Sequence, residues 1–294
     1  MALSHLISAS ALAQALEDSR AAGAPRLIVV DCRFDLMAPA WGREAFLQQH
    51  VPGALYFSLD DDLSGPHTGR NGRHPLPGIE AFAQRLGQAG IDADTTVIAY
   101  DQGALMMAAR LWWMLRWLGH GKVKVLDGGM PAWLAAGLPT ESGAAQPIAA
   151  RHYAAQPRSD MLVTAEHVQA ALGQGQQRLI DARAPERYRG EVEPLDRVPG
   201  HIPGALNRPF TANLEQGLLV PVARLRAEFA PLLDGVSPAQ VVHTCGSGVS
   251  AAANVLAMEE AGLTGSRLYA GSWSEWSSDP ERPVETGNAP SNAS

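Results

Sequence analysis

The chain has 294 residues, of which 46% are hydrophobic and 18% charged, an ordinary composition for a globular protein of about two domains. Its formal net charge of −7 argues against nucleic acid and membrane partners, because both attract basic surfaces. Only two cysteines occur, Cys32 and Cys245, and no Cys/His spacing resembles a zinc site, so we expect neither a disulfide framework nor a metal. A reducing, cytoplasmic location fits this cysteine usage.

The chain begins with a predicted amphipathic helix over residues 8–22. Gln14, Glu17 and Asp18 break its apolar run and no basic segment precedes it, so we expect no signal peptide. No run of about 18 apolar residues occurs in the sequence, and we therefore expect no membrane-spanning helix.

Short strands alternate with helices in the first half of the chain. Branched residues predict strands over residues 97–100 and 123–126, and apolar residues predict helices over 104–118 and 131–136. This alternation is typical of an α/β fold with a parallel sheet and helices on both faces. The longer helix carries three tryptophans that we expect to pack in a core or a domain interface, namely Trp112, Trp113 and Trp117.

The second half of the chain repeats the first. Four sequence blocks recur in the same order, which indicates a duplicated domain. The blocks and their copies are Asp31-Cys32-Arg33 and Asp181-Ala182-Arg183, His50-Val51-Pro52-Gly53-Ala54 and His201-Ile202-Pro203-Gly204-Ala205, the strands that end at Asp101 and Cys245, and the Gly-to-Trp segments 128–133 and 271–276.

We therefore expect two tandem domains with the same α/β fold, each a parallel sheet with helices on both faces. The first spans residues 1–140 and the second residues 160–284. Residues 141–159 are rich in Ala, Pro, Gly and Gln without periodicity, so we expect a linker there. The polar tail at residues 285–294 is expected to be disordered.

A cysteine stands where a strand predicted over residues 240–244 gives way to a helix that ends near Gly262. The turn between them reads Cys-Gly-Ser-Gly-Val-Ser from Cys245. Backbone N–H groups can converge on an anion in such a turn, and the helix dipole adds positive potential, so the pattern favours a reactive thiolate. These six residues alone leave open the alternative of a small, buried, unreactive cysteine.

Taken together, these motifs resemble the tandem rhodanese-like sulfurtransferases. The likeness is carried by the duplicated His-Val/Ile-Pro-Gly-Ala block, the single loop cysteine of the second copy and the segment Gly-Ser-Trp-Ser-Glu-Trp at residues 271–276. The loop after Cys245 is more similar to that of the 3-mercaptopyruvate sulfurtransferases than to that of the thiosulfate sulfurtransferases, which have an Arg-Lys pair there. The resemblance also implies a non-catalytic first domain, in which Asp101 replaces the cysteine.

The activity that the resemblance implies is sulfur transfer by double displacement. Cys245 takes sulfur from a small-molecule donor, 3-mercaptopyruvate or thiosulfate, and becomes a persulfide. An acceptor then removes the outer sulfur, and the acceptor is a thiol, a thioredoxin-like protein or cyanide. No cofactor is implied. The loop backbone would hold the sulfur anion, through Gly246, Gly248, Val249 and Ser250.

The resemblance also implies which side chains serve the reaction. Arg187 matches a substrate-binding arginine, whose planar guanidinium suits a carboxylate. Asp196 occupies the place of a second such arginine, and we expect the adjacent Arg197 to take its role. A Cys-Ser-His-Asp relay is implied as well, with Ser247, His74 and Asp60 as its other members. Ser247 and His74 could equally be turn residues.

Other polar residues are expected to be structural. His50 and His201 occur in both copies, including the copy without the cysteine, so catalysis does not explain them. The remaining residues of this kind are His243 in a predicted strand, Cys32 at a strand end, and the pairs Asp31/Arg33 and Asp181/Arg183.

Three other functions compete with this one. Thiosulfate sulfurtransferase activity by the same persulfide is the nearest alternative. A cysteine phosphatase would need an arginine six residues after the cysteine, where this chain has Ala251. A catalytically silent binding module is disfavoured by the intact loop at Cys245.

Overall fold

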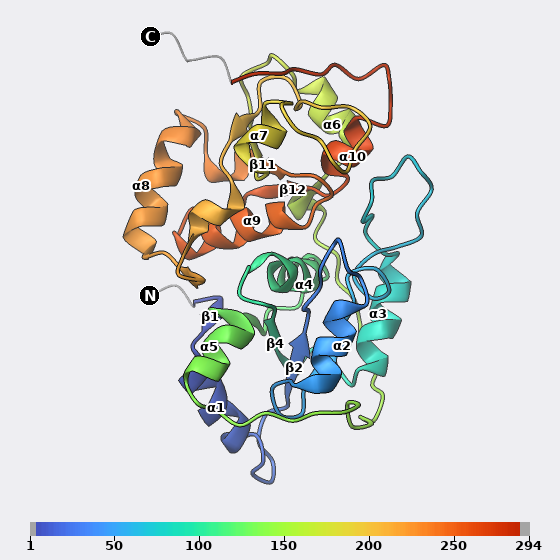
Figure 1. Cartoon of the computed structure of the whole chain (residues 1–294), viewed down its shortest axis with the longest axis vertical. Helices are drawn as coiled ribbons and strands as arrows, with labels where there is room; N and C mark the ends of the chain where they lie inside the picture. The colour runs from blue at the N-terminus through green and yellow to red at the C-terminus, as the bar shows by residue number, and fades with distance from the viewer. Residues whose placement is uncertain (1–3, 289–294) are drawn as a thin grey trace. The chain divides into compact units, whose positions relative to one another are not determined.

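The computed structural model describes residues 4–288, and within them the chain forms two compact units (Figure 1). The first unit contains residues 4–65, 76–158 and 216–219, and the second contains residues 66–75, 159–215 and 220–288. This division differs from the expected sequential one in three places. The loop at residues 66–75 groups with the second unit, residues 216–219 group with the first, and residues 141–158 of the expected linker also group with the first.

A five-stranded parallel sheet forms the centre of the first unit, with the strand order β1-β5-β4-β2-β3. The longest ladder joins β2 to β4, with Leu27 opposite Thr96 and Asp31 opposite Tyr100. The elements of this unit are β1 (Leu6–Ile7), α1 (Ala9–Asp18), β2 (Leu27–Asp31), α2 (Trp41–Gln48), β3 (Leu55–Tyr56), α3 (Ile79–Gln88), β4 (Thr96–Tyr100), α4 (Met106–Trp117), β5 (Val123–Leu126), α5 (Gly129–Ala135) and β10 (Leu218–Leu219).

The second unit repeats this arrangement with the strand order β6-β12-β11-β7-β8, again parallel. The duplicated α/β fold with helices beside parallel sheets is therefore confirmed. Its elements are η1 (Ser159–Met161), β6 (Leu162–Val163), α6 (Ala165–Ala170), β7 (Arg178–Asp181), α7 (Pro185–Tyr188), β8 (Leu206–Asn207), η2 (Phe210–Asn213), β9 (Leu214–Glu215), α8 (Val222–Leu233), η3 (Pro238–Gln240), β11 (Val241–Thr244), α9 (Ser250–Glu260), β12 (Arg267–Tyr269) and α10 (Ser272–Trp276).

The tryptophan-rich helix α4 is buried along nearly its whole length. Trp112 and Trp113 are at most 1% exposed and Trp117 is 7% exposed, so packing explains all three. The helix begins two residues later than expected, because Leu105 adopts a left-handed backbone (φ 66°) where the chain leaves the loop.

The expected linker and the expected tail each begin at a glutamate that makes equivalent contacts in the two units. Glu141 pairs with His50 by an isolated bridge, and Glu285 pairs with His201 in the same way. Each glutamate also accepts the N–H of a glycine in the Pro-Gly turn at 2.9 Å. The segment from residue 141 therefore packs on the first unit, and the chain up to residue 288 packs on the second. Residues 289–294 of the expected tail lie outside the described residues.

The duplicated polar residues hold equivalent positions in the two units. His50 Nδ1 lies 2.6 Å from the Phe46 carbonyl oxygen, and His201 Nδ1 lies 2.7 Å from that of Tyr188. Each imidazole also stacks on that aromatic ring, with centroids 4.0 and 3.8 Å apart. These contacts agree with a structural role for both histidines.

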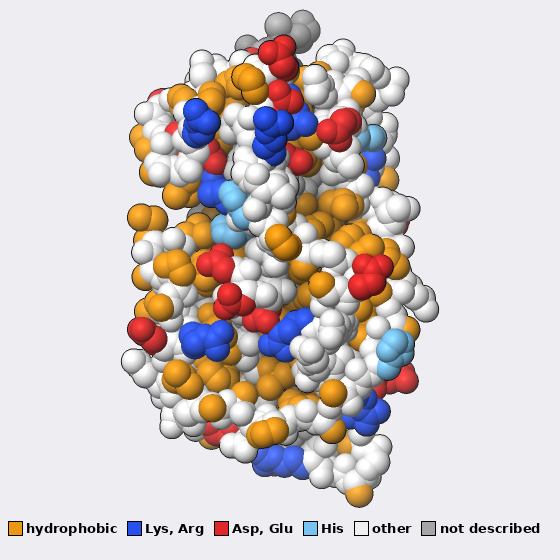
Figure 2. All heavy atoms as spheres, turned by 90° about the vertical axis from the view of Figure 1, so that its right-hand side faces the viewer, with side chains coloured by type: hydrophobic (Ala, Val, Ile, Leu, Met, Phe, Trp, Pro, Cys, Tyr) orange, Lys and Arg blue, Asp and Glu red, His pale blue; other side chains and the backbone are white. Residues whose placement is uncertain are grey.

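Charged side chains of both signs are interspersed on the face shown in Figure 2, and no basic patch stands out there. Within residues 4–288, no helix has the length and apolar composition needed to cross a membrane.

Candidate active site

The loop that begins at Cys245 lies between β11 and α9, at the carboxyl end of a central strand. Parallel strands leave room for a ligand at that edge of a sheet. Gly248 is required in the loop, because its φ is 76° and a Cβ atom there would lie 2.2 Å from the Ala270 carbonyl oxygen. The tight turn buries Cys245, which is only 2% exposed.

One backbone N–H and one hydroxyl group lie near the Cys245 sulfur. The backbone N–H of Gly248 donates to Sγ at 3.1 Å, and the hydroxyl of Ser272 lies 3.9 Å from it. Ser272 Oγ also accepts the N–H of Cys245 at 3.1 Å and donates to the Tyr269 carbonyl at 2.9 Å. The sulfur is thus held where a negative charge would be stabilised.

Ser272 is a site residue that the sequence analysis did not single out. Its φ of 54° lies in the left-handed region, and the equivalent position in the first unit is Gly129, with φ 56°. A serine in a conformation that suits glycine stores backbone strain, which is common at functional sites. The replacement of glycine by serine between the two copies of the Gly-to-Trp block was the signal available in the sequence.

Arg183 is a buried cation close to the cysteine loop. It forms a bidentate pair with Asp181 and a longer contact to Glu193 at 3.4 Å. Burial lowers the pKa of Arg183, but the charges of Asp181, Glu193 and Cys245 outweigh burial and raise the pKa overall. Arg183 therefore stays charged and anchors the segment that carries Glu193.

Arg187, the predicted donor-binding residue, lies beside the loop. Its Nη2 donates to both carboxylate oxygens of Glu193 at 2.7 and 3.0 Å and approaches Asp196 at 3.4 Å. Its Nε is buried and has no hydrogen-bond partner among the described residues. A Cβ atom on Gly246 would lie 3.5 Å from Arg187 Nη1, so this guanidinium borders the cysteine loop.

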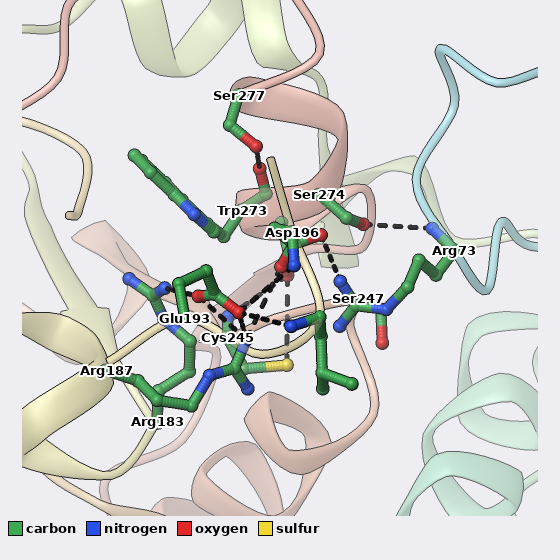
Figure 3. A network of polar contacts seen from close by, with 12 residues as sticks. Arg73, Arg183, Arg187, Glu193, Asp196, Cys245, Ser247, Trp273, Ser274 and Ser277 are labelled. Atoms are coloured by element: carbon green, nitrogen blue, oxygen red, sulfur yellow. Dashed lines mark hydrogen bonds and ion pairs between the residues drawn. The ribbon is translucent and has the colours of Figure 1, made fainter. Parts of the chain in front are cut away.

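A second arginine, Arg73, reaches the same place from the loop at residues 66–75 (Figure 3). Its guanidinium forms an ion pair with Asp196, and its backbone N–H donates to Ser274 Oγ at 2.9 Å. Burial raises the pKa of Asp196, whereas the hydrogen bond and charge of Arg73 lower it. Sequence analysis did not select Arg73, because its contact with Asp196 joins distant parts of the chain.

Arg197, expected to be the second donor-binding arginine, has an exposed side chain. It makes no ion pair with any residue in the range 4–288. Arg197 and Arg73 both line a cavity of about 150 Å³ in the second unit. Its role in donor binding stays a prediction.

Two of the three expected relay partners lie together in the second unit. Ser247 Oγ and His74 Nδ1 are 2.7 Å apart, and both side chains are buried. Asp60 belongs to the first unit, where burial and then the charge of Asp61 raise the pKa of its carboxyl group. Its part in a relay stays a prediction.

In the first unit, the side chain of Asp101 binds to the backbone of the corresponding loop. The buried carboxylate of Asp101 accepts four backbone N–H groups at 2.9 to 3.2 Å, from Gly103, Leu105, Met107 and Ala108. This loop binds an anion with its backbone, as expected for a strand-to-helix turn. The carboxylate fills it and supplies no nucleophilic sulfur.

The other cysteine and the strand histidine are both buried. Burial, followed by the charge of Asp31, raises the pKa of Cys32 well above its usual range, so its thiol stays protonated and unreactive. Burial lowers the pKa of His243 to about 3, and its Nε2 packs 3.1 Å from Met258 Sδ. Within residues 4–288, no group of three or more His, Cys, Asp or Glu side chains is arranged to hold a metal ion.

Comparison with known proteins identifies a family. The family model described as "Rhodanese-like domain" matches residues 8–136 and 164–279, one copy in each half of the chain. A probable 3-mercaptopyruvate sulfurtransferase from Pseudomonas aeruginosa is 44% identical over 98% of this chain and 100% of its own length. A putative thiosulfate sulfurtransferase, SseB from Mycobacterium tuberculosis, is 40% identical over 97% of this chain and 98% of its own length.

Solved structures agree with the sequence relatives. The crystal structure of SseA from Escherichia coli, a 3-mercaptopyruvate sulfotransferase, is similar to this chain with a TM-score of 0.79 and 34% identity. The similarity covers 92% of this chain and 99% of SseA. The tandem arrangement expected from the repeated blocks is thereby confirmed.

Proposed function

Because the chain belongs to the family of proteins built from rhodanese-like domains, we propose that it is an enzyme that moves sulfur from 3-mercaptopyruvate to an acceptor through a persulfide on Cys245. One observation carries this proposal. The Cys245 sulfur accepts an N–H from its own loop at 3.1 Å, and the guanidinium of Arg187, paired with Glu193, borders the same loop. A nucleophile and a carboxylate-binding group therefore stand next to each other.

In the first step, the thiolate of Cys245 attacks the thiol sulfur of 3-mercaptopyruvate. A sulfur–sulfur bond forms, and the carbon–sulfur bond of the donor breaks with its electron pair left on carbon. The resulting enolate takes the proton of the donor thiol and becomes pyruvate. The Gly248 N–H lies where it stabilises the negative charge on Cys245 Sγ before transfer.

In the second step, an acceptor attacks the outer sulfur of the persulfide. The sulfur–sulfur bond breaks, and its electron pair returns to Cys245 as the thiolate. A thiol acceptor, including that of a thioredoxin-like protein, becomes a persulfide, and cyanide becomes thiocyanate. Both steps balance without an added oxidant or cofactor.

The hydroxyl of Ser247 and the imidazole of His74 form a pair that can hold and pass a proton. We assign to this pair the transfer of the donor's thiol proton to the leaving carbon, with Asp60 as the proposed third member. Two free cysteines that are both buried fit a reducing compartment, and we place the enzyme in the cytoplasm.

Thiosulfate is the second candidate donor, and the name of the mycobacterial relative favours it. Thiosulfate must bring two negative charges close to the sulfur of Cys245. Gly246 and Ser247, the next two residues of the loop, carry no positive charge. The cationic side chains stand beside the loop instead, where the carboxylate of 3-mercaptopyruvate can reach Arg187, so we favour that donor.

Neither competing class suits this loop. A phosphatase of the cysteine type has an arginine six residues after the nucleophile, and this chain has the fully buried Ala251 there. A silent binding module would not need a cysteine in a loop that supplies its sulfur with a hydrogen-bond donor.

Steady-state kinetics on a matched pair of cysteine variants test the proposal. Cys245→Ser is expected to abolish pyruvate release from 3-mercaptopyruvate, because a hydroxyl does not ionise at neutral pH. Cys32→Ala should retain turnover. Activity in Cys245→Ser above a few per cent of the parent would place the nucleophile elsewhere and defeat the proposal.

A further inference from the structure

We propose that the second unit has a separate binding site for a small organic carboxylate, in which Arg267 and His167 receive the negative charge of the ligand. The site lies in a cavity of about 760 Å³ that is formed by the starts of β11 and β12, by β6 and by the first turn of α6. It is independent of the proposed sulfur transfer, and its test does not require that reaction.

The cavity lies away from the cysteine loop. Arg267 begins β12 and is paired with Val242 of β11, three residues before Cys245. Three residues of a strand span about 10 Å. The strands are parallel, so Arg267 stands at their amino ends and the cysteine loop at their carboxyl ends. The residues that line the cavity fall within 159–167, 239–240 and 265–267, and they are separate from those placed around Cys245.

Arg267 is a partly buried cation without a carboxylate partner. Its Nη1 lies 3.4 Å from His167 Nε2, and its buried Nε has no hydrogen-bond partner among the described residues. No aspartate or glutamate within residues 4–288 forms an ion pair with it. Every other described arginine of the second unit that is at least partly buried does pair with a carboxylate. Arg267 is therefore the exception in this unit.

An anion from solution would supply the charge that Arg267 lacks. Removing a charged group from water is costly, and proteins normally offset this cost with an opposite charge. Burial lowers the pKa of Arg267 from its ordinary value, although a guanidinium still stays charged at neutral pH. The cavity gives a ligand access to this side chain. A carboxylate there would accept charge-assisted hydrogen bonds from the terminal nitrogens of the guanidinium.

His167 is held beside the guanidinium by the start of its helix. Thr164 caps α6, and its hydroxyl accepts the N–H of His167 at 3.3 Å. Arginine can only donate, so His167 Nε2 accepts the hydrogen bond from Arg267 and is unprotonated in this arrangement. When that nitrogen takes up a proton, the imidazole becomes a second donor to the same anion.

The opposite wall of the cavity is fixed as well. The side chain of Gln240 accepts the Ser237 N–H at 2.9 Å and donates to the Gln176 carbonyl at 2.8 Å. A Cβ atom on Gly265 would lie 3.5 Å from Ala239 Cβ, so the turns that precede β11 and β12 are in contact. The cavity is therefore formed by residues that are already held in place, which lowers the entropic cost of binding.

The other lining residues indicate the class of ligand. Leu162, Val163 and Ala239 give the cavity apolar surface, which suits a ligand with a short hydrocarbon part. Asp160 adds a carboxylate to the same lining, and its charge disfavours a ligand with more than one negative charge. A monocarboxylate meets both conditions better than a phosphate, which carries up to two charges near pH 7.

Residue-resolved NMR of the full chain, titrated with butyrate, tests the site. The backbone amide signals of Gly265 and Arg267 are expected to shift to saturation at millimolar butyrate. Those of Gly246 and Gly248 report binding at the cysteine loop separately. Butyramide has the same size without the charge, so its Kd at Gly265 should be higher by about 10-fold or more, the effect of losing a charge-assisted hydrogen bond.

Two variants assign the binding to Arg267. Arg267→Gln should raise the Kd of butyrate by about 10-fold or more. Arg178→Gln is the matched control, because Arg178 also begins a strand of this sheet but pairs with Asp234, and it should keep the parent's Kd.

Three results would overturn the inference. The first is a response to butyramide equal to that to butyrate, which would show an apolar surface without an anion site. The second is an unchanged Kd in Arg267→Gln. The third is saturation of the same signals by inorganic phosphate at a lower concentration than butyrate, which would contradict the class of ligand. The comparison of butyrate with butyramide uses the parent protein, so it decides the matter even if Arg267→Gln does not fold.

Discussion

Ser272 offers a test of how the second unit holds its cysteine loop. The residue is fully buried, adopts φ 54°, and accepts the N–H of Cys245 through its hydroxyl. Ser272→Ala removes the acceptor and leaves this buried N–H without its hydroxyl partner, at a cost of about 1–3 kcal/mol. Ser272→Gly loses the same hydrogen bond but relieves the left-handed strain, which returns about 1 kcal/mol.

Urea unfolding of the purified variants, followed by circular dichroism, measures these differences. The expected order of stability is parent, then Ser272→Gly, then Ser272→Ala. Ser277→Ala is the matched control, because its hydroxyl only donates to the Trp273 carbonyl at 2.7 Å and leaves no N–H unpaired. We expect this control to lose less than about 1 kcal/mol.

If Ser272→Ala is as stable as the parent, the hydroxyl contributes nothing to the loop, which would refute the assigned hydrogen bond. If Ser272→Gly is less stable than Ser272→Ala, the backbone at this position carries no strain. Both variants should also lower kcat/KM, since Ser272 Oγ lies 3.9 Å from the reactive sulfur.

Arg187, the choice of donor and the buried His243 each provide a further test. Arg187→Ala should lower kcat/KM for 3-mercaptopyruvate by about 10- to 150-fold. The control Arg189→Ala loses only an exposed pair with Glu191 and should keep the parent's kcat/KM. An equal kcat/KM for both variants in steady-state kinetics would remove Arg187 from the site. The parent should prefer 3-mercaptopyruvate over thiosulfate by more than about tenfold in kcat/KM, and equal or better use of thiosulfate would support the alternative donor. Burial lowers the pKa of His243 to about 3 in the folded protein. Between about pH 6.5 and 3 only the unfolded chain therefore gains a proton there, and the protein loses stability as the pH falls. His243→Leu should reduce the loss of unfolding free energy from pH 7 to 5.5 by about 1 kcal/mol in urea titrations, and an unchanged loss would contradict the burial argument.

The repeated blocks predict much of the fold, because each block marks the end of a strand or the start of a helix. The strand that ends before Cys245 and the helix that follows it are found as β11 and α9, within a residue or two of their expected bounds. Two-residue strands such as β3 and β8 were not predicted, because so short a segment carries no periodicity.

The site was harder to predict wherever it depends on contacts between distant segments. Cys245 and Arg187 stand out from their local motifs, and the structure places both at one loop. Arg73 has no local motif, and contacts with residues far away in the sequence, such as its ion pair with Asp196, 123 residues away, bring it to that loop. The expected linker has no secondary structure of its own over most of its length, yet it packs on the first unit through single backbone hydrogen bonds, such as that from Arg151 to Gly87 at 2.8 Å.

In the proposed mechanism, Cys245 carries the transferred sulfur. Mass spectrometry of the proteolysed protein after incubation with 3-mercaptopyruvate, without acceptor, tests it most directly. We predict a mass increase of one sulfur atom on the peptide that contains Cys245, reversed by cyanide, and no change on the peptide that contains Cys32. Pyruvate release without added sulfur on Cys245, or added sulfur on Cys32 instead, would contradict this role of Cys245.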